Sequence, residues 1–299
     1  MRWQLSVGSD PDGRLADVVE LAGECAAVDR AEPFSDASVL AVSSAVRYVW
    51  AYEGDSDQLA GVAIVDGEMV EAAVRPPARG CGIGAALLAA SFELGARRTW
   101  AHGNLPAARR LAAHYRATVA RRLKLLRLPA GAIETGPPRL PPGFRLRHYA
   151  GSSDDAALLR VNRAAFADLP DQGGWSPADL TSRISADWFR AEDLLLLIDA
   201  DTDALAGFHW TKVHPGGDCE VYVVALDPEY QGRGLAAELT RAGLRHLADL
   251  GCSDVMLYVD STNTRALKVY RRLGFTEDRE DILYVTQPVP ASDPVVWQG

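Results

Sequence analysis

The sequence contains one unusual pattern twice, and the two copies lie 152 residues apart. Residues 72–76, an apolar segment ending in proline, lead into the glycine-rich run 79–84, and residues 224–228 lead into the run 231–236 in the same way. An apolar segment with helical spacing follows each run. This interval is far longer than the roughly 20–50 residues of a solenoid repeat. The pattern therefore predicts a duplicated domain of layered strands and helices, an α/β (α+β layered) fold.

A proline-rich segment separates the two copies. Residues 129–143 hold five prolines, which exclude a helix or a central strand there. We therefore expect an N-terminal domain over residues 1–128, a linker over 129–143 and a C-terminal domain over 144–299. In the C-terminal half, the patterns predict strands at 144–148, 194–198, 204–213, 220–226, 255–259 and 282–286, and helices at 153–166, 232–250 and 264–273.

Composition excludes several classes of protein. The chain has 299 residues with 48% hydrophobic and 24% charged residues, which argues against disorder, and its net charge of −9 argues against a general nucleic-acid-binding surface. The longest apolar run, residues 194–198, is far shorter than a membrane span, and the first residues lack the apolar core of a signal peptide. The four cysteines, Cys25, Cys81, Cys219 and Cys252, match no zinc or disulfide spacing. We expect a cytoplasmic protein and a monomer, although no sequence pattern decides the oligomeric state.

The second glycine-rich run has the properties of an anion site. Gly232 and Gly234 let the backbone turn so that several N–H groups point to one spot, and the start of the following helix adds partial positive charge. The lysine of a P-loop is absent, and Ala237 stands where a dinucleotide-binding turn would need a glycine. The alternative is a glycine-rich turn that binds nothing. The occurrence of a similar glycine-rich run at residues 79–84 favours a pyrophosphate site over such a turn.

The order of motifs in the C-terminal half resembles the GNAT N-acetyltransferases. A strand, the run Gln/Arg-x-x-Gly-x-Gly/Ala, a helix, a second strand, an Asn, and a helix with a Tyr before Gly-Phe occur at residues 223–226, 231–236, 258–263 and 270–275. This resemblance implies two tandem GNAT acyl-CoA N-acyltransferase folds, each a mixed, mostly antiparallel sheet flanked by helices. Residues 100–103, 162–166, 172–175 and 207–215 resemble those tandem members that acetylate the cysteinyl amine of Cys-GlcN-Ins, a small-molecule substrate.

The resemblance also implies acetyl-CoA as the co-substrate, without a metal. Its implied binding residues in the C-terminal half are Val224, Ala225, Leu226, Gln231, Gly232, Arg233, Gly234, Leu235, Ala236, Ala237 and Asn263. The matching positions in the N-terminal half are Ala72, Ala73, Val74, Arg79, Gly80, Cys81, Gly82, Ile83 and Gly84. Asn263 has the alternative role of capping the helix that follows it.

Two residues are implied to be catalytic. Glu220 begins the strand that leads to the glycine-rich run, which suits a base for the attacking amine, and Tyr270 is the implied acid for the CoA thiolate. Taken alone, a Glu at a strand start such as Glu220 is most often a solvated surface charge, and Tyr270 is compatible with a core side chain. Cys219 beside Glu220 has no His–Asp relay nearby, so we expect an incidental thiol rather than a nucleophile.

The implied substrate contacts are carboxylates and other polar groups, which suit a ligand with an ammonium and many hydroxyls. They are Asp36, Asp171, Lys212, Glu220, Tyr258 and Asp260. Because Asp36 comes from the N-terminal half, we expect the substrate to lie between the domains. By sequence alone Lys212 is also compatible with a solvated strand lysine. Two other functions stay open: acetylation of an antibiotic amine, a polyamine or a protein N-terminus, and a non-enzymatic acyl-CoA-binding sensor.

The N-terminal half lacks the implied acid. The position seven residues after Asn104 is Leu111, whereas the position seven residues after Asn263 is Tyr270, and Tyr115 is out of register. We therefore expect the N-terminal domain to bind a cofactor without catalysing the reaction.

Overall fold

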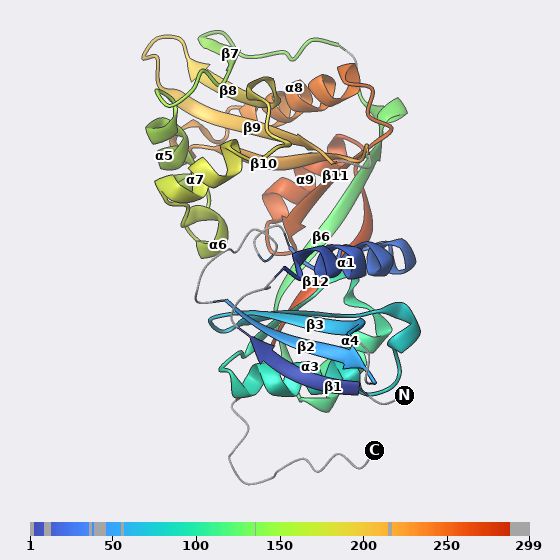
Figure 1. Cartoon of the computed structure of the whole chain (residues 1–299). Coiled ribbons are helices and arrows are strands. Elements are labelled where there is room, and N and C mark those ends of the chain that lie inside the picture. The colour runs from blue at the N-terminus through green and yellow to red at the C-terminus, as the bar shows by residue number, and fades with distance from the viewer. Residues whose placement is uncertain are drawn as a thin grey trace. The chain divides into compact units, whose positions relative to one another are not determined.

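The two glycine-rich runs lie in separate units of the computed structural model (Figure 1). The structure describes residues 3–8, 13–35, 38, 46–54, 57–134, 136–214 and 217–287, and of residues 130, 170 and 171 the backbone alone. One unit consists of Met1–Leu123 with Arg279–Gly299, and the other of Lys124–Asp278. The chain passes between them in two strands, β6 (Thr118–Pro129) and β12 (Thr276–Val285).

In the first unit the strands lie in the order β1-β2-β3-β4-β5-β12. Its further strands and helices are β1 (Trp3–Gly8), α1 (Leu15–Asp29), β2 (Arg47–Glu53), β3 (Leu59–Asp66), β4 (Met69–Val74), α3 (Ile83–Glu93), β5 (Arg98–Ala101) and α4 (Pro106–His114). β4 and β5 are parallel, whereas the neighbouring pairs, including β12 with β5, are antiparallel.

In the second unit the strands lie in the order β7-β8-β9-β10-β11-β6, which repeats the arrangement of the first unit. Its strands and helices are β7 (Phe144–His148), α5 (Asp155–Ala165), α6 (Pro170–Gly173), α7 (Pro177–Ile184), β8 (Leu194–Asp199), β9 (Leu205–Val213), β10 (Cys219–Leu226), α8 (Leu235–Asp249), β11 (Asp254–Asp260) and α9 (Thr264–Arg272). Here the parallel pair is β10 with β11. The shared order confirms the predicted tandem fold.

The units differ from the expected domain boundaries at both crossing strands. Residues 124–128, expected in the N-terminal domain, belong to the second unit, and residues from Arg279 on, expected in the C-terminal domain, belong to the first. In β12, residues 282–285 pair with β5 of the first unit. The reason is that the two copies have equivalent strand positions, so each unit is completed by a strand from the other half of the sequence.

Helices cover both faces of the strands in the second unit. On one face, Leu158 of α5 and Leu180 of α7 pack with Phe208 and Trp210 of β9 in one buried cluster. On the other face, α8 and α9 pack on Cys219 and Val221 of β10 and on Val255 and Leu257 of β11 in a second cluster. Because side chains alternate along a strand, Glu220 lies on the α5–α7 face.

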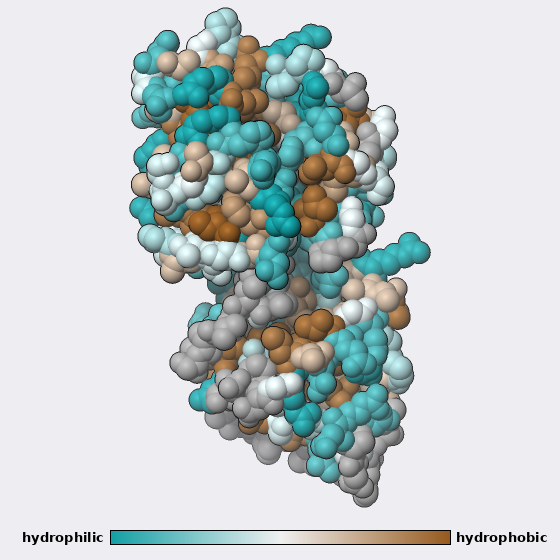
Figure 2. Space-filling view, turned by 45° about the horizontal axis from the view of Figure 1, so that its top comes forward, coloured by the Kyte–Doolittle hydropathy of each residue, from teal (hydrophilic) through white to brown (hydrophobic). Residues whose placement is uncertain are grey.

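The surface is of mixed character. On the face drawn in Figure 2, hydrophobic residues form separate patches among hydrophilic ones. Among the helices in the described part of the chain, none combines the length and the apolar content that crossing a membrane requires.

Candidate active site

The strands β10 and β11 are paired only at their beginnings. Cys219, Glu220 and Val221 pair with residues 255–257, and among the described residues no further pair follows, although β10 continues to Leu226. A β-bulge at Tyr222 shifts the register of β10 against β9 at the same point. Bulges bend a strand and increase its twist, which accounts for the separation of the two parallel strands. The expected acyl-CoA segment, residues 224–226, thus lies where the neighbouring strand no longer occupies the backbone edge of β10.

The glycine-rich turn between β10 and α8 has the conformation expected for an anion site. Gly232 and Gly234 have φ angles of 80° and 77°, in the region that favours glycine. The first N–H groups of a helix have no intrahelical partner. Gly234 is the N-cap of α8 and provides no side-chain cap for them. Gly80 and Gly82 in the first unit have nearly the same angles, 80° and 86°. The repeat seen in the sequence is therefore a repeat of backbone conformation.

Polar side chains expected at the cofactor have partners within the protein. The Asn263 Oδ1 accepts a hydrogen bond from the backbone N–H of Ala266 at 3.0 Å, so Asn263 does cap α9. The Gln231 Oε1 accepts a hydrogen bond from Arg265 at 3.4 Å. These side chains fix the two loops, and the backbone N–H groups remain the candidate phosphate donors.

Glu220 is a buried carboxylate paired with a histidine. Its Oε2 lies 2.8 Å from Nε2 of His214, in the connection between β9 and β10. Across the strands Glu220 is the register partner of Lys212 on β9 and of Met256 on β11. Burial argues against a solvated surface charge at this position.

Four of the expected site residues share one face. Lys212, Glu220, Tyr258 and Asp260 lie on the α5–α7 face, since register partners and alternate residues of a strand point to the same side. The Asp260 Oδ1 accepts hydrogen bonds from the backbone and the hydroxyl of Thr262. Of the other expected substrate residues, Asp171 has its backbone in α6, and Asp36 lies outside the described residues.

Lys212 is buried between aromatic rings and is not a solvated lysine. Its Nζ lies 4.8 Å from the ring centroid of Trp188 and 5.5 Å from that of Tyr222. Such cation–π contacts hold an ammonium at a fixed place. This aromatic support was not predictable from the sequence, because Trp188, Tyr222 and Lys212 come from three separate segments.

Tyr270 lies on the other side of β10. It packs on the cluster formed by α8, α9 and the α8–α9 face of the strands, and its ring centroid is 5.7 Å from that of Phe275. Burial raises the pKa of Tyr270 to about 12, so its hydroxyl is protonated at neutral pH. The structure thus places a carboxylate and a protonated phenol on opposite faces of one strand.

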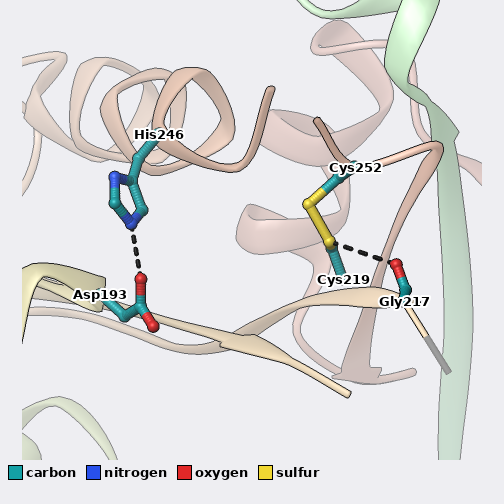
Figure 3. Close-up of a disulfide and its surroundings, with 5 residues drawn as sticks. All are labelled: Asp193, Gly217, Cys219, His246 and Cys252. Atoms are coloured by element: carbon teal, nitrogen blue, oxygen red, sulfur yellow. Dashed lines mark hydrogen bonds and ion pairs between the residues drawn. A yellow bond between two sulfur atoms is a disulfide. The ribbon is translucent and has the colours of Figure 1, made fainter. Parts of the chain in front are cut away.

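Cys219 and Cys252 form a disulfide in the structure, as Figure 3 shows, so the expected incidental thiol at Cys219 is wrong. The register of β10 and β11 brings the two strand beginnings together, with a Cα–Cα distance of 6.0 Å that suits a disulfide. Sequence spacing missed it because the partners are 33 residues apart and follow no known motif. Cys25 and Cys81 are free thiols.

The first unit contains a cavity of about 360 Å³ beside its own glycine-rich turn. The lining includes residues 72–74, Gly80, Gly82, His102 and Leu111. Leu111 stands at the position equivalent to Tyr270, where the sequence predicts that the first unit lacks a catalytic tyrosine. The side chain of Arg79 is bound within the unit, because its Nη1 and Nη2 lie 2.7 and 2.8 Å from the two carboxylate oxygens of Asp29.

His102 of this lining is held between two buried carboxylates. Its Nδ1 lies 3.0 Å from Asp281 and its Nε2 3.1 Å from Glu71. Burial alone would lower the pKa of His102, but the hydrogen bonds and charges of Asp281 and Glu71 raise it to about 9. A histidine that stays protonated in this way is a poor base. In the described parts of both units, no group of three or more His, Cys, Asp or Glu side chains is arranged to hold a metal ion.

Comparisons with known proteins agree with this geometry. Residues 161–275 match the model of the acetyltransferase (GNAT) family. The mycothiol acetyltransferase of Gordonia bronchialis is 45% identical over 273 residues, which cover 87% of each chain. Those of Rhodococcus opacus (44%, covering 91% of this chain and 94% of the relative) and Mycolicibacterium gilvum (41%, covering 95% and 97%) are similar to almost the same extent.

Solved structures share the tandem fold at low sequence identity. A GCN5-related N-acetyltransferase from Sphaerobacter thermophilus has a TM-score of 0.71 at 20% identity and covers 97% of this chain and 98% of its own. A tandem GNAT protein from the clavulanic acid biosynthesis pathway has a TM-score of 0.74 at 15% identity and covers 97% and 100%. With the full-length identity to the curated relatives, the conclusion is that this chain belongs to the mycothiol acetyltransferase family of GNAT acetyltransferases.

Proposed function

We propose that this chain is a mycothiol synthase, which transfers the acetyl group of acetyl-CoA to the cysteinyl amine of Cys-GlcN-Ins. The observation that carries the proposal is the 41–45% identity, along nearly the whole chain, to relatives named mycothiol acetyltransferase. The arrangement of Lys212, Glu220, Tyr258 and Asp260 on one face supports it, since this face offers both a base and polar contacts.

The residues of the second unit fit acetyl-CoA, which supplies the acetyl group as a thioester. The two left-handed glycines and the uncapped start of α8 suit a pyrophosphate, which would be bound by the backbone of residues 231–237. The edge of β10 at residues 224–226 suits the pantetheine arm. The backbone N–H of Ala225 is the candidate donor to the oxyanion that develops on the thioester carbonyl.

Glu220 and Tyr270 would divide the proton transfers between them. Glu220 takes a proton from the substrate ammonium, which frees the nitrogen lone pair for attack. As the C–N bond forms and the C–S bond breaks, Tyr270 gives its proton to the departing thiolate. The raised pKa of Tyr270 keeps that proton in place until the thiolate forms.

The remaining side chains of the face would recognise the substrate. Lys212, held by its two aromatic rings, is positioned to donate to sugar or inositol oxygens. Tyr258 and Asp260 offer a hydroxyl and a carboxylate from the same face, and Asp260 also binds Thr262. Contacts of Asp36 and Asp171 with the substrate are proposed from the family resemblance alone.

The first unit would bind a second acetyl-CoA without catalysing transfer. Its cavity lies beside a glycine turn of the same conformation, while Leu111 replaces the acid and His102 is held as a cation. Calorimetric titration with acetyl-CoA would then give two sites per chain. A titration that shows a single site, and loses that site in Gly234→Ala, would contradict binding of acetyl-CoA in the first unit.

We also propose that the protein is a monomer in the cytoplasm. The acidic balance of −9 suits neither a membrane surface nor a nucleic-acid surface. Sedimentation of the purified protein tests whether it is a monomer.

The test of the proposed function is release of CoA by purified protein with acetyl-CoA and Cys-GlcN-Ins, with the product identified by mass. Saturable release with an N-acetylated product is the expected result. Binding of acetyl-CoA without release would contradict this acceptor and favour another amine, such as an antibiotic or a polyamine, or a sensor.

A further inference from the structure

The carboxylate of Glu220 touches a second titratable side chain that no part of the proposed mechanism uses. The Nε2 of His214 lies 2.8 Å from Oε2 of Glu220, and the exposed fractions of the two side chains are 27% and 11%. The histidine therefore reaches from the buried carboxylate towards solvent. In the GNAT resemblance neither this histidine nor its contact was part of the expected site.

The position of His214 is fixed from both sides. Its backbone N–H donates to the carbonyl of Asp218 at 2.8 Å, and its carbonyl accepts from the N–H of Gly217 at 2.9 Å, so the backbone of His214 is bound to the two residues that precede Cys219. Cys219 itself is tied to Cys252 by the disulfide. An imidazole on such a support can hold one carboxylate oxygen in one orientation.

A buried base has to release its proton after each turnover. When Glu220 has accepted a proton from the substrate ammonium, it is a neutral acid with little exposure to water. Until that proton leaves, Glu220 cannot accept another. An imidazole at hydrogen-bond distance is a suitable acceptor, because one ring nitrogen can take up a proton while the other gives one up.

We propose that His214 is a positioning residue that orients Glu220 and carries the substrate proton from it to solvent. This inference rests on the proposed acetyltransferase function. The proton moves from the ammonium nitrogen to Glu220, then from Glu220 to Nε2 of His214, while the proton on Nδ1 leaves to water. Exchange of the ring protons with water then returns the imidazole to the tautomer with its proton on Nδ1, ready for the next turnover. The amide nitrogen of the product keeps one hydrogen, Tyr270 supplies the hydrogen of the CoA thiol, and the second proton lost by nitrogen restores Tyr270. The net release is one proton per acetyl transfer.

The charged groups around this pair do not replace the histidine. Lys212 faces Glu220 from β9 and is a donor, with its ammonium held over Trp188 and Tyr222. Tyr258 and Asp260 lie on β11 on the same face, and Asp260 accepts from Thr262. Asp218 binds the backbone of His214 through its own carbonyl. Of the described side chains, His214 is the one for which the structure gives a hydrogen bond to Glu220.

The test compares His214→Ala and His214→Gln with the wild type in the CoA-release assay. His214→Gln can still donate a hydrogen bond to Glu220 but cannot accept its proton. The matched control is His246→Gln, which removes another histidine–carboxylate pair of the same unit, Nε2 of His246 at 2.6 Å from Asp193 (Figure 3). Thermal unfolding and acetyl-CoA binding verify that each variant is folded.

We expect both His214 variants to lose about 10²-fold in kcat, with KM for acetyl-CoA within about twofold of the wild type. Added imidazole should raise kcat of His214→Ala in proportion to its free-base concentration and leave wild type and His246→Gln unchanged. The proton transfer would be overturned if kcat of His214→Gln were near that of the wild type. It would also be overturned if kcat of His214→Ala fell and added imidazole did not raise it; His214 would then be a structural contact only. Absence of turnover in the wild type would instead contradict the proposed function itself, and this inference with it.

Discussion

The ring of His209 occupies the space that a side chain on Gly243 would need. A Cβ built on Gly243 would lie 2.1 Å from Cε1 and 2.2 Å from Nδ1 of His209. His209 is on β9 and Gly243 is on α8, so the glycine allows the helix to pack closely on the strand. The Nδ1 of the same ring lies 3.0 Å from the carbonyl oxygen of Leu239, one turn earlier in the helix.

Gly243→Ala should therefore destabilise the protein. The added methyl group cannot be accommodated without moving the ring or the helix, and overpacking of this kind costs about 1–3 kcal/mol. Urea unfolding followed by circular dichroism measures the change. Gly23→Ala in α1, where a Cβ meets nothing within 4 Å, is the control and should be neutral or stabilising. Equal stability of the two variants would contradict the close packing.

His209 should make the protein less stable at acidic pH. Complete burial lowers its pKa from the usual 6.5 to about 4, so the folded state holds His209 neutral. The stabilisation is fully present above pH 6.5 and is lost as the pH falls from there towards 4, by up to about 3 kcal/mol. Urea unfolding between pH 7 and pH 4.5 should show a smaller loss in His209→Leu than in the wild type. If wild type and His209→Leu lost the same stability between pH 7 and pH 4.5, the low pKa of His209 would be refuted.

His102 should have the opposite dependence. Burial opposes its protonation, but Asp281 and Glu71 outweigh burial and raise its pKa to about 9. Its contribution is fully present below pH 6.5 and is lost as the pH rises through 9, with a similar limit of about 3 kcal/mol. NMR of the imidazole should find His102 doubly protonated at pH 8. If the His102 imidazole instead titrated near pH 6.5, Asp281 and Glu71 would not be stabilising its protonated form.

The disulfide between Cys219 and Cys252 should contribute to stability. For partners 33 residues apart, the chain-entropy model gives about 3–4 kcal/mol. Reductant should lower the urea midpoint of the wild type and leave that of Cys219→Ser/Cys252→Ser, already low, unchanged. Alkylation of the protein unfolded in urea without reductant should label two cysteines, Cys25 and Cys81. Four labelled cysteines without reductant would contradict the bond.

Tyr270→Phe should slow the chemical step without weakening acetyl-CoA binding. The substitution removes one hydroxyl and keeps the ring that packs against Phe275. Loss of a general acid typically lowers kcat by about 10²–10⁴-fold. Steady-state kinetics with calorimetric binding of acetyl-CoA separates the two effects. Unchanged kcat would leave Tyr270 as a core residue.

Much of the fold could be predicted because the repeated pattern is local. The spacing from Gly82 to Gly234 indicated two copies, and the two runs have the same backbone angles. The first part of β12 was missed because residues 276–281 are all polar. The structure explains this composition: Lys124 and Arg127 on β6 pair with Glu277 and Asp278 across the strands, at 2.6 and 3.0 Å.

The site was predictable where it follows from the chain order, and not where it depends on contacts between distant segments. Strand alternation places Lys212 and Glu220 on one face, and resemblance supplied both residues. The contact of His214 with Glu220 was within reach, because the predicted strands 204–213 and 220–226 follow each other closely and His214 and Glu220 stand at their facing ends. The His102–Asp281 contact was not, because 179 residues separate the partners.

The most direct test of the central claim is kcat of Glu220→Gln in the CoA-release assay with Cys-GlcN-Ins, measured beside acetyl-CoA binding. The glutamine keeps the size of the side chain and cannot take the substrate proton. We predict a fall in kcat of about 10²–10⁴-fold with acetyl-CoA affinity within about twofold of the wild type. Wild-type kcat in Glu220→Gln would contradict the account, because the reaction would then need no base at this position.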